Sequence, residues 1–182
     1  MKKIYLLTAM LGAFALEAAP LNYNWSVDTS SLSGQTGQLS FQYNTSGTDA
    51  TTATISQFSG ATLGSFSVIG NVIGNLSGSV VINPTSVVAL NEFLQTVTFG
   101  NSFKFVLTLA GALLDNPQDF NGSQFALQLL PGAGSPLVTV DVFPGFEPIV
   151  SQDASVSDVP EPSTALLVLL AAPVAALLRR RK

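Results

Sequence analysis

Oxygen-bearing side chains gather in the short segment Asp115-Asn116-Pro117-Gln118-Asp119-Phe120-Asn121-Gly122. Hard cations such as calcium prefer oxygen ligands on a flexible loop, and Asp119-x-Asn121-Gly122 matches part of a calcium-loop motif. If the segment holds calcium, we expect Asp115, Asp119 and Asn121 to provide ligands. The full motif has more clustered acids and a distant bidentate Glu, and Asp and Asn also form plain turns. A turn without metal is therefore the favoured interpretation, and calcium is kept as an alternative.

The residue types that most often carry catalysis are missing, because the chain contains neither histidine nor cysteine. A Ser-His-Asp triad, a thiolate nucleophile and zinc bound by His or Cys are therefore excluded. Nine acidic residues lie between Leu21 and Asp158, so a surface hydrolase that uses two carboxylates stays open in principle. Nothing in the sequence brings two of these acids together, and we interpret them as solvated loop residues. We expect a protein that is not an enzyme and has no cofactor.

Aromatic side chains offer a third kind of chemistry, because exposed rings can stack on sugars. The candidates are Tyr23, Trp25 and Tyr43. Each occupies an apolar position of a pattern that alternates with a period of two, so we expect all three to belong to the core first. A carbohydrate- or calcium-binding module remains the alternative function for the domain.

This alternation of apolar and polar residues is the main structural signal, and it predicts β-strands. The longest apolar stripe comprises Phe103, Phe105, Leu107 and Leu109. Separate strands are predicted, among others, over 52–58, 64–69, 93–99 and 103–109. A turn is expected at Gly100-Asn101, between the last two. Many short strands with turn residues between them predict an all-β domain over 20–146, an antiparallel β-sandwich with either a jelly-roll or an immunoglobulin-like topology.

Charge is distributed unevenly along the chain. Between Leu21 and Asp158 the only basic residue is Lys104, against nine acids, which gives this part a net charge of −8. Nucleic acid is excluded as a partner because it requires clustered Lys and Arg. Net negative charge favours solubility and mutual repulsion. Residues 147–158 lose the alternation, are rich in Ser, Asp, Gln and Pro, and are predicted to be a flexible spacer.

The N-terminus carries a secretory pattern. Lys2 and Lys3 precede an apolar stretch from Ile4 to about Leu16, which is typical of a signal peptide with a helical apolar core. We assign residues 1–19 to this signal, with cleavage after Ala15 or near Ala19, and expect the Sec translocon as a partner.

The C-terminus combines a turn-like motif, an apolar run and a cationic block. The apolar run 165–178 contains 14 residues. As a transmembrane helix it would be about 21 Å long, short of a hydrocarbon core about 30 Å thick. It is therefore predicted to be a marginal, temporary anchor. The cationic block acts as a topological stop on the cytoplasmic side, and it consists of Arg179, Arg180, Arg181 and Lys182.

Residues 159–182 resemble a PEP-CTERM sorting signal, of the kind found on short uncharacterised exported proteins. The motif residues are Pro160, Glu161, Pro162 and Ser163. The resemblance implies a Gram-negative cell whose exosortase, a membrane-embedded cysteine protease, cuts near this motif. It further implies transient anchoring in the inner membrane, then a place at the cell surface or in the extracellular matrix. Proteins of this kind are linked to extracellular polysaccharide and biofilm. We therefore expect a non-enzymatic surface or matrix protein.

Overall fold

The computed structural model describes residues 19–47, 51–84, 88–115, 121–130 and 135–159. The strands of this part are β1 (Leu21–Asp28), β2 (Thr36–Thr45), β3 (Thr51–Ile69), β4 (Val72–Gly74), β5 (Ser79–Ile82), β6 (Glu92–Gly111), β7 (Ser123–Leu130), β8 (Val138–Val142), β9 (Ile149–Gln152) and β10 (Val156–Asp158). Two short helical turns, η1 (Ser30–Leu32) and α1 (Ala112–Asp115), interrupt them. Every strand pairing in the described part is antiparallel, which confirms the predicted all-β, antiparallel class.

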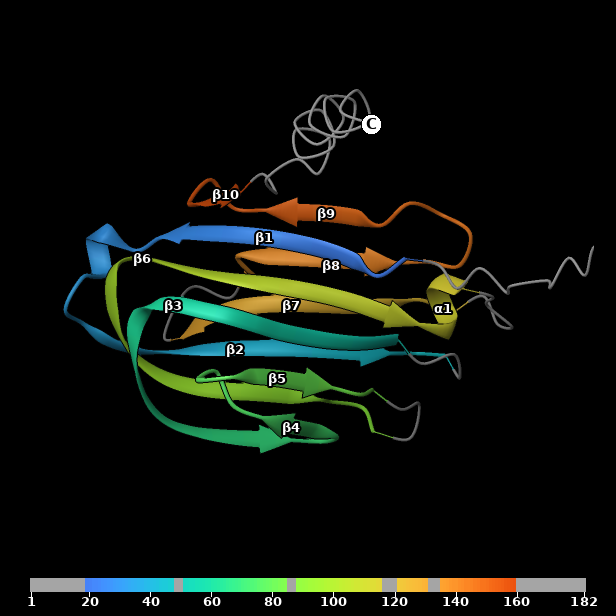
Figure 1. Ribbon diagram of the computed structural model, residues 1–182, viewed down its shortest axis with the longest axis horizontal. Helices are drawn as coiled ribbons and strands as arrows, with labels where there is room; N and C mark the ends of the chain where they lie inside the picture. The colour runs from blue at the N-terminus through green and yellow to red at the C-terminus, as the bar shows by residue number, and fades with distance from the viewer. Residues whose placement is uncertain (1–18, 48–50, 85–87, 116–120, 131–134, 160–182) are drawn as a thin grey trace, which may run out of the picture.

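The two longest strands, β3 and β6, pair along most of their length and bend together near the middle (Figure 1). Before the bend β6 also pairs with β2, and after it β6 pairs with β1. The single sheet thereby folds over into two layers. One layer runs β10-β1-β6-β3-β5-β4, and the other runs β3-β6-β2-β7-β8-β9. This arrangement is consistent with the predicted sandwich.

The bend replaces a predicted turn. Gly100 and Asn101 lie within β6, so the expectation of two separate strands joined by a turn there was wrong. The pairing register shifts at this point. The β3 residues that pair with Phe99 and Lys104 of β6 are separated by a single residue, Gly60. A β-bulge bends a strand without reversing it. A hydrogen bond connects Thr29 to the bend, since its side-chain hydroxyl donates to the Gly100 carbonyl at 2.8 Å.

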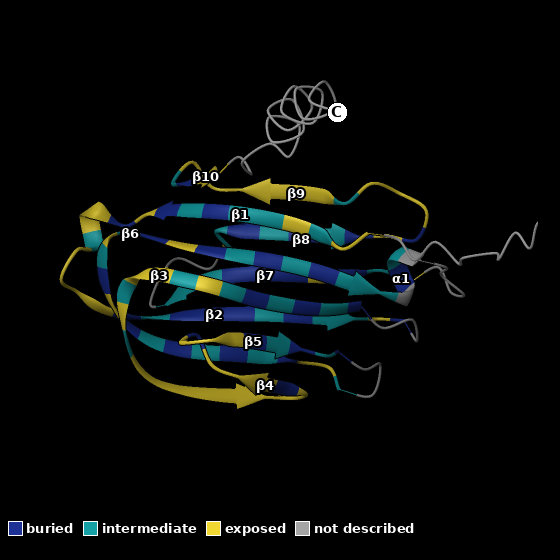
Figure 2. Cartoon of the chain, in the orientation of Figure 1, coloured by how far each residue is buried: buried dark blue, intermediate teal, exposed yellow. Residues whose placement is uncertain are grey.

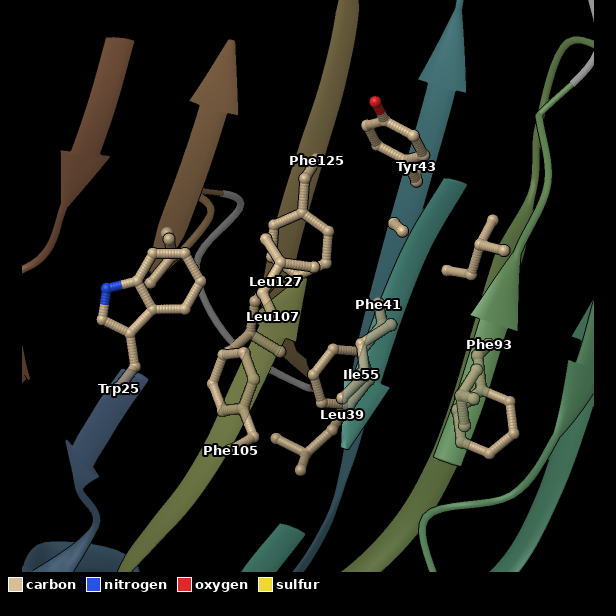
Figure 3. Close-up of a cluster of buried hydrophobic side chains, with 14 of the residues drawn as sticks. Trp25, Leu39, Phe41, Tyr43, Ile55, Phe93, Phe105, Leu107, Phe125 and Leu127 are labelled. Atoms are coloured by element: carbon tan, nitrogen blue, oxygen red, sulfur yellow. The ribbon is translucent and has the colours of Figure 1, made fainter. Parts of the chain in front are cut away.

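Inward-facing side chains of both layers form one core. Buried residues recur along the strands of both layers (Figure 2). The predicted stripe from Phe103 to Leu109 is confirmed, because its four apolar members are all buried. Aromatic rings meet across the layers (Figure 3). Trp25 of β1 stacks on Phe125 of β7 with a centroid distance of 6.2 Å, and Phe41 of β2 meets the ring of Phe105 of β6 edge-on at 5.5 Å. Face-to-face sheets pack about 10 Å apart, which such rings fill.

Tyr43 of β2 places its hydroxyl in this core. Burial raises the pKa of Tyr43 from its ordinary value of 10.0 to about 12. The hydroxyls of Thr51 and Ser123 oppose the rise, but none of the three groups has a hydrogen bond of standard geometry to a described residue, so desolvation dominates.

Alkaline pH is therefore expected to destabilise the protein through Tyr43. Folded Tyr43 keeps a proton that the unfolded chain loses above about pH 10. The contribution of Tyr43 to the free energy of unfolding is therefore complete below pH 10 and is lost as the pH rises towards 12. The free energy of unfolding falls by roughly 3 kcal/mol over this range, at about 1.4 kcal/mol per pKa unit. Urea denaturation between about pH 9 and 12 should show a flatter profile for Tyr43→Phe than for the wild type. Equal alkaline losses in both proteins would contradict this assignment.

The predicted flexible spacer over 147–158 is wrong, because most of this segment is folded. β9 pairs with β8, and β10 pairs with β1, so the chain crosses from one layer to the other between them. The sequence pattern could not predict these strands because all of β9 is exposed and only Val156 of β10 is buried. Backbone pairing rather than side-chain burial holds them. The folded domain therefore extends beyond the predicted boundary at 146 to Val159, whose N–H donates to the Asn24 carbonyl at 2.8 Å.

Both predicted targeting helices lie outside the described residues, in 1–18 and 160–182. Within residues 19–159, gaps excepted, no helix has the length and apolar character needed to cross a membrane.

Candidate functional site

The predicted sorting residues 160–163 and 179–182 lie outside the described part of the chain. The predicted calcium ligands are only partly described. Asp119 lies outside the described residues, and Asp115 ends α1 with a side chain that is not described. Asn121 is exposed just before β7. No group of three or more His, Cys, Asp or Glu residues suited to a metal ion occurs among the described residues.

The aromatic residues considered for sugar stacking belong to the core, as the alternation predicted. Trp25 and Tyr43 are fully buried. Tyr23 is partly buried and stacks on Trp25 with a centroid distance of 5.3 Å. Trp25 and Tyr43 therefore have no exposed ring face for a ligand, whereas Tyr23 borders a small surface hollow next to Asn24 and Asp158.

A different pair of aromatic residues is exposed, on the turn that follows β8. Phe143 is 42% exposed and Phe146 is 77% exposed. Between them, Pro144 presets φ at the first turn position and Gly145 adopts a φ of +73° at the second, as a type II turn requires. The N–H of Phe146 donates to the Phe143 carbonyl at 3.2 Å and closes the turn. The turn thus projects two rings outside the core.

These rings line an apolar hollow of about 570 Å³, together with Pro144, Glu147 and Ile149. The ring of Phe143 lies against the backbone of Gly122, where a Cβ would come within 2.8 Å of it. Glycine at 122 therefore lets β7 and the turn approach each other closely. Phe143 also borders a second, more polar hollow of about 350 Å³ at the ends of β2, β7 and β8.

Side chains of four neighbouring strands continue this surface as a row. Asn44 of β2 pairs with Gln124 of β7, Gln124 pairs with Asp141 of β8, and Asp141 pairs with Ile149 of β9. Residues paired across strands point to the same face, here the outer one. Three inter-strand spacings make the row roughly 14 Å long. Its character changes from two amides through a carboxylate to an apolar end.

Hydrogen bonds orient the polar members of the row. The Nε2 of Gln124 donates to Oδ1 of Asp141 at 2.6 Å, and the Asn44 Oδ1 accepts the backbone N–H of Asn91 at 2.7 Å. Such bonds restrict the side chains and reduce the entropy lost when a ligand binds. We call the row and the two hollows together the β8–β9 groove.

The charged residues that line this groove are both acidic, Asp141 and Glu147. Glu147 also acts on the neighbouring strand β1, because burial first and the negative charge of Glu147 second raise the pKa of Tyr23. An acidic groove repels anionic ligands. Its amides, carboxylates and exposed rings suit a neutral ligand with hydroxyl groups and an apolar face.

The residues of the groove are not marked as a binding site by the sequence, in which Asp141 and Glu147 are only two of nine scattered acids. One local signal was present, since Phe143-Pro144-Gly145-Phe146 places two aromatic residues around a strong turn pair. The cross-strand row carries no such signal, because its members come from four different strands and are aligned only by the register between them. The chain matches no family model, no curated protein and no solved structure.

Proposed function

We propose that this chain is an exported, non-enzymatic protein of the bacterial cell surface or extracellular matrix, with a β-sandwich body. Its C-terminal tail, with the motif Pro160-Glu161-Pro162, would be sorted by an exosortase. The order of motif, apolar run and cationic block supports this proposal, together with the signal-like N-terminus. The absence of histidine and cysteine from the sequence supports a role in binding rather than catalysis.

We further propose that the body binds neutral extracellular polysaccharide at the β8–β9 groove. The observation that carries this proposal is the pair of exposed rings, Phe143 and Phe146, next to the outward polar row. Sugar rings combine an apolar face, which packs on aromatic side chains, with hydroxyls that pair with amides and carboxylates. The length of the row suits an oligosaccharide segment rather than a single sugar. The acidic residues of the groove favour neutral chains over those that contain uronic acids.

The position of the folded C-terminal strands supports the proposal that the body is held close to the membrane before it is released. The last described residue, Val159, is hydrogen-bonded to β1. Residues 160–164 separate it from the apolar run 165–178. Five residues span at most about 17 Å. While the run is in the membrane, the body would therefore lie next to the bilayer.

Replacing Phe146 by alanine is expected to weaken polysaccharide binding about tenfold, since one stacked ring contributes on the order of 1.4 kcal/mol. Affinity electrophoresis in gels that contain neutral glucans or mannans would measure the effect, with a uronate polysaccharide as the anionic comparison. Gln124→Ala should weaken binding as well. The matched control is Leu90→Ala, which removes an exposed apolar side chain from the loop before β6, outside the groove. Equal retardation of wild type and Phe146→Ala in every gel would contradict binding at the groove.

A further inference from the structure

The second half of β3 forms an edge of the folded-over sheet. Residues 61–69 pair with β6 on one side. On the other side, no strand of the described part pairs with them, since β5 contacts only residues 53–56 of β3. An edge of this kind presents backbone N–H and C=O groups in a row that another strand can pair with.

Apolar side chains on this edge face the core side of the sheet and yet are exposed. Phe66 pairs with Gln95 and Val68 pairs with Phe93, and both β6 partners are buried. Phe66 stacks on Phe93 with a centroid distance of 5.2 Å. Even so, Phe66 is 51% exposed and Val68 is 44% exposed. A further strand at this edge would place its own side chains beside these two and bury part of their surface.

More apolar surface adjoins this edge. Ile69 at the end of β3 and Ile73 of β4 are also exposed. Figure 2 shows the exposed second half of β3 beside β4, at the bottom of the molecule. Because successive residues of a strand point to opposite faces, Ile69 lies on the outer face of the sheet, opposite to Val68. We call the exposed apolar residues Phe66, Val68, Ile69 and Ile73, on both faces of this edge, the β3 edge patch.

A bulge divides the edge and leaves one straight segment. The register shifts between Leu63 and Phe66. The buried Gln95 amide holds this bulge by donating to the carbonyls of Gly64 at 2.9 Å and Ser65 at 3.2 Å. From Phe66 to Ile69 the pairing with β6 is regular again. Residues 66–69 are therefore the part of the edge that can extend the sheet.

Charge distinguishes this edge from the rest of the protein. No charged residue lies between Asp49 and Glu92 in the chain, whereas the body from Leu21 to Asp158 has a net charge of −8. One acid, Glu92 of β6, pairs with Ile69, and its carboxylate accepts hydrogen bonds from the Ser40 hydroxyl and the Gln42 amide. Exposed edges are commonly protected by lysine, proline or inward-pointing charge, and residues 66–69 contain none of these. Copies of an acidic protein repel each other over most of their surface. The β3 edge patch combines exposed apolar side chains with a strand segment that carries no charge of its own.

We propose that the β3 edge patch binds a second copy of this chain, with residues 66–69 of the two copies paired as antiparallel strands. An antiparallel edge can pair with its own copy about a two-fold axis, which gives the same contacts on both sides. Phe66 and Val68 must point to the core side in both copies, so the axis is perpendicular to the sheet. In this arrangement, one residue of the segment lies directly opposite the same residue of the second copy.

The edge at β9 in the same layer is a poorer site for a second copy. Val150 of β9 is 40% exposed, much as Val68 is. However, Asp141 pairs with β9, and Glu147 and Asp153 flank it. Two copies that meet there would bring these acids together, and like charges in contact are destabilising.

Two matched lysine variants test the proposal. Sedimentation of residues 20–159, which contain the whole described core, should show a monomer–dimer equilibrium in the micromolar range that tightens with added salt as repulsion is screened. Val68→Lys should weaken dimerisation about tenfold or more, because a lysine on the edge opposes pairing. Val150→Lys, a valine of similar exposure on the other edge strand of the layer, should leave it unchanged. Circular dichroism would confirm that both variants are folded.

Cysteine scanning tests the same contact in the full chain, which has no cysteine of its own. Paired residues in antiparallel strands have Cα atoms about 4.5–5.5 Å apart, within the range of a disulfide. A single cysteine placed in turn at each of residues 66–69 should therefore cross-link two exported copies at one of these positions. Ser151→Cys in β9 is the control and should not cross-link. A monomer at all concentrations without cross-links, equal effects of both lysine variants, or a cross-link to a different protein would each overturn the proposal.

Discussion

A protein that carries Gly60→Ala is expected to lose about 3 kcal/mol of stability or more, a large part of the total for a domain of this size. Gly60 has a φ of +95°, a conformation that costs an L-residue about 1–2 kcal/mol. A Cβ at this position would overlap the Ser102 carbonyl oxygen and lie 2.9 Å from the Cα of Phe103. Overpacking of this kind adds about 1–3 kcal/mol. Because both contacts are with the backbone of β6, the bend of the two long strands would have to change.

Variants of two other glycines allow the cost of the backbone conformation to be measured separately from the cost of overpacking. Gly34 also has a positive φ, +79°, but a Cβ there would meet no atom within 4 Å, so Gly34→Ala should cost only the backbone term. Gly78 has neither feature, and Gly78→Ala should stay within about 0.5 kcal/mol of the wild type. Urea denaturation of the three variants would give the comparison. If Gly60→Ala were no less stable than Gly34→Ala, the close approach of β3 and β6 at the bend would be contradicted.

Loss of the sorting motif is expected to abolish removal of the tail. In cells that contain the exosortase, the wild-type chain should be recovered without residues that follow the cleavage site, as measured by intact mass. Glu161→Ala should instead accumulate with its C-terminal end intact, since the motif Pro160-Glu161-Pro162 is proposed to be the recognition element. Replacing the cationic block 179–182 by alanine should reduce retention in the membrane, because positive charges on the cytoplasmic side are expected to orient the predicted helix.

Glu147→Ala is the matched control, because it removes the same side chain from the folded body. This variant should be processed as the wild type is. Recovery of the full-length wild-type chain from the cytosol, with both ends intact, would contradict export and sorting together. Since sorting and polysaccharide binding are read by different measurements, a normal cleavage pattern with no retardation in glycan gels would remove only the proposed ligand.

Local alternation predicted the inward stripes well. The apolar residues from Phe103 to Leu109 form an uninterrupted buried stripe, because one face of their strand lies on the core and the other does not. The same method failed at Gly100, where a glycine that permits a bulge resembles a glycine that permits a turn. It also failed at β9, whose four residues are all exposed, because pairing of backbones leaves no mark on side-chain types.

The candidate groove shows the same limit. The turn around Pro144 and Gly145 could be recognised from neighbouring residues, but Asn44, Gln124 and Asp141 come from three different strands. Their alignment depends on the register between β2, β7 and β8. Register is determined by how the whole sheet packs, not by the residues of one strand.

Residue types and local spacing were enough to predict the strand class, the inward faces, the net negative charge and the lack of histidine and cysteine chemistry. Three features became clear only in the folded chain: the path of β3 and β6 through both layers, the pairing of β9 and β10 with the sheet, and the edge at which Phe66 and Val68 stay exposed. Each of them depends on pairing and packing between different strands, which the residue pattern of one strand does not encode. Such contacts form only when the two layers close over a common core.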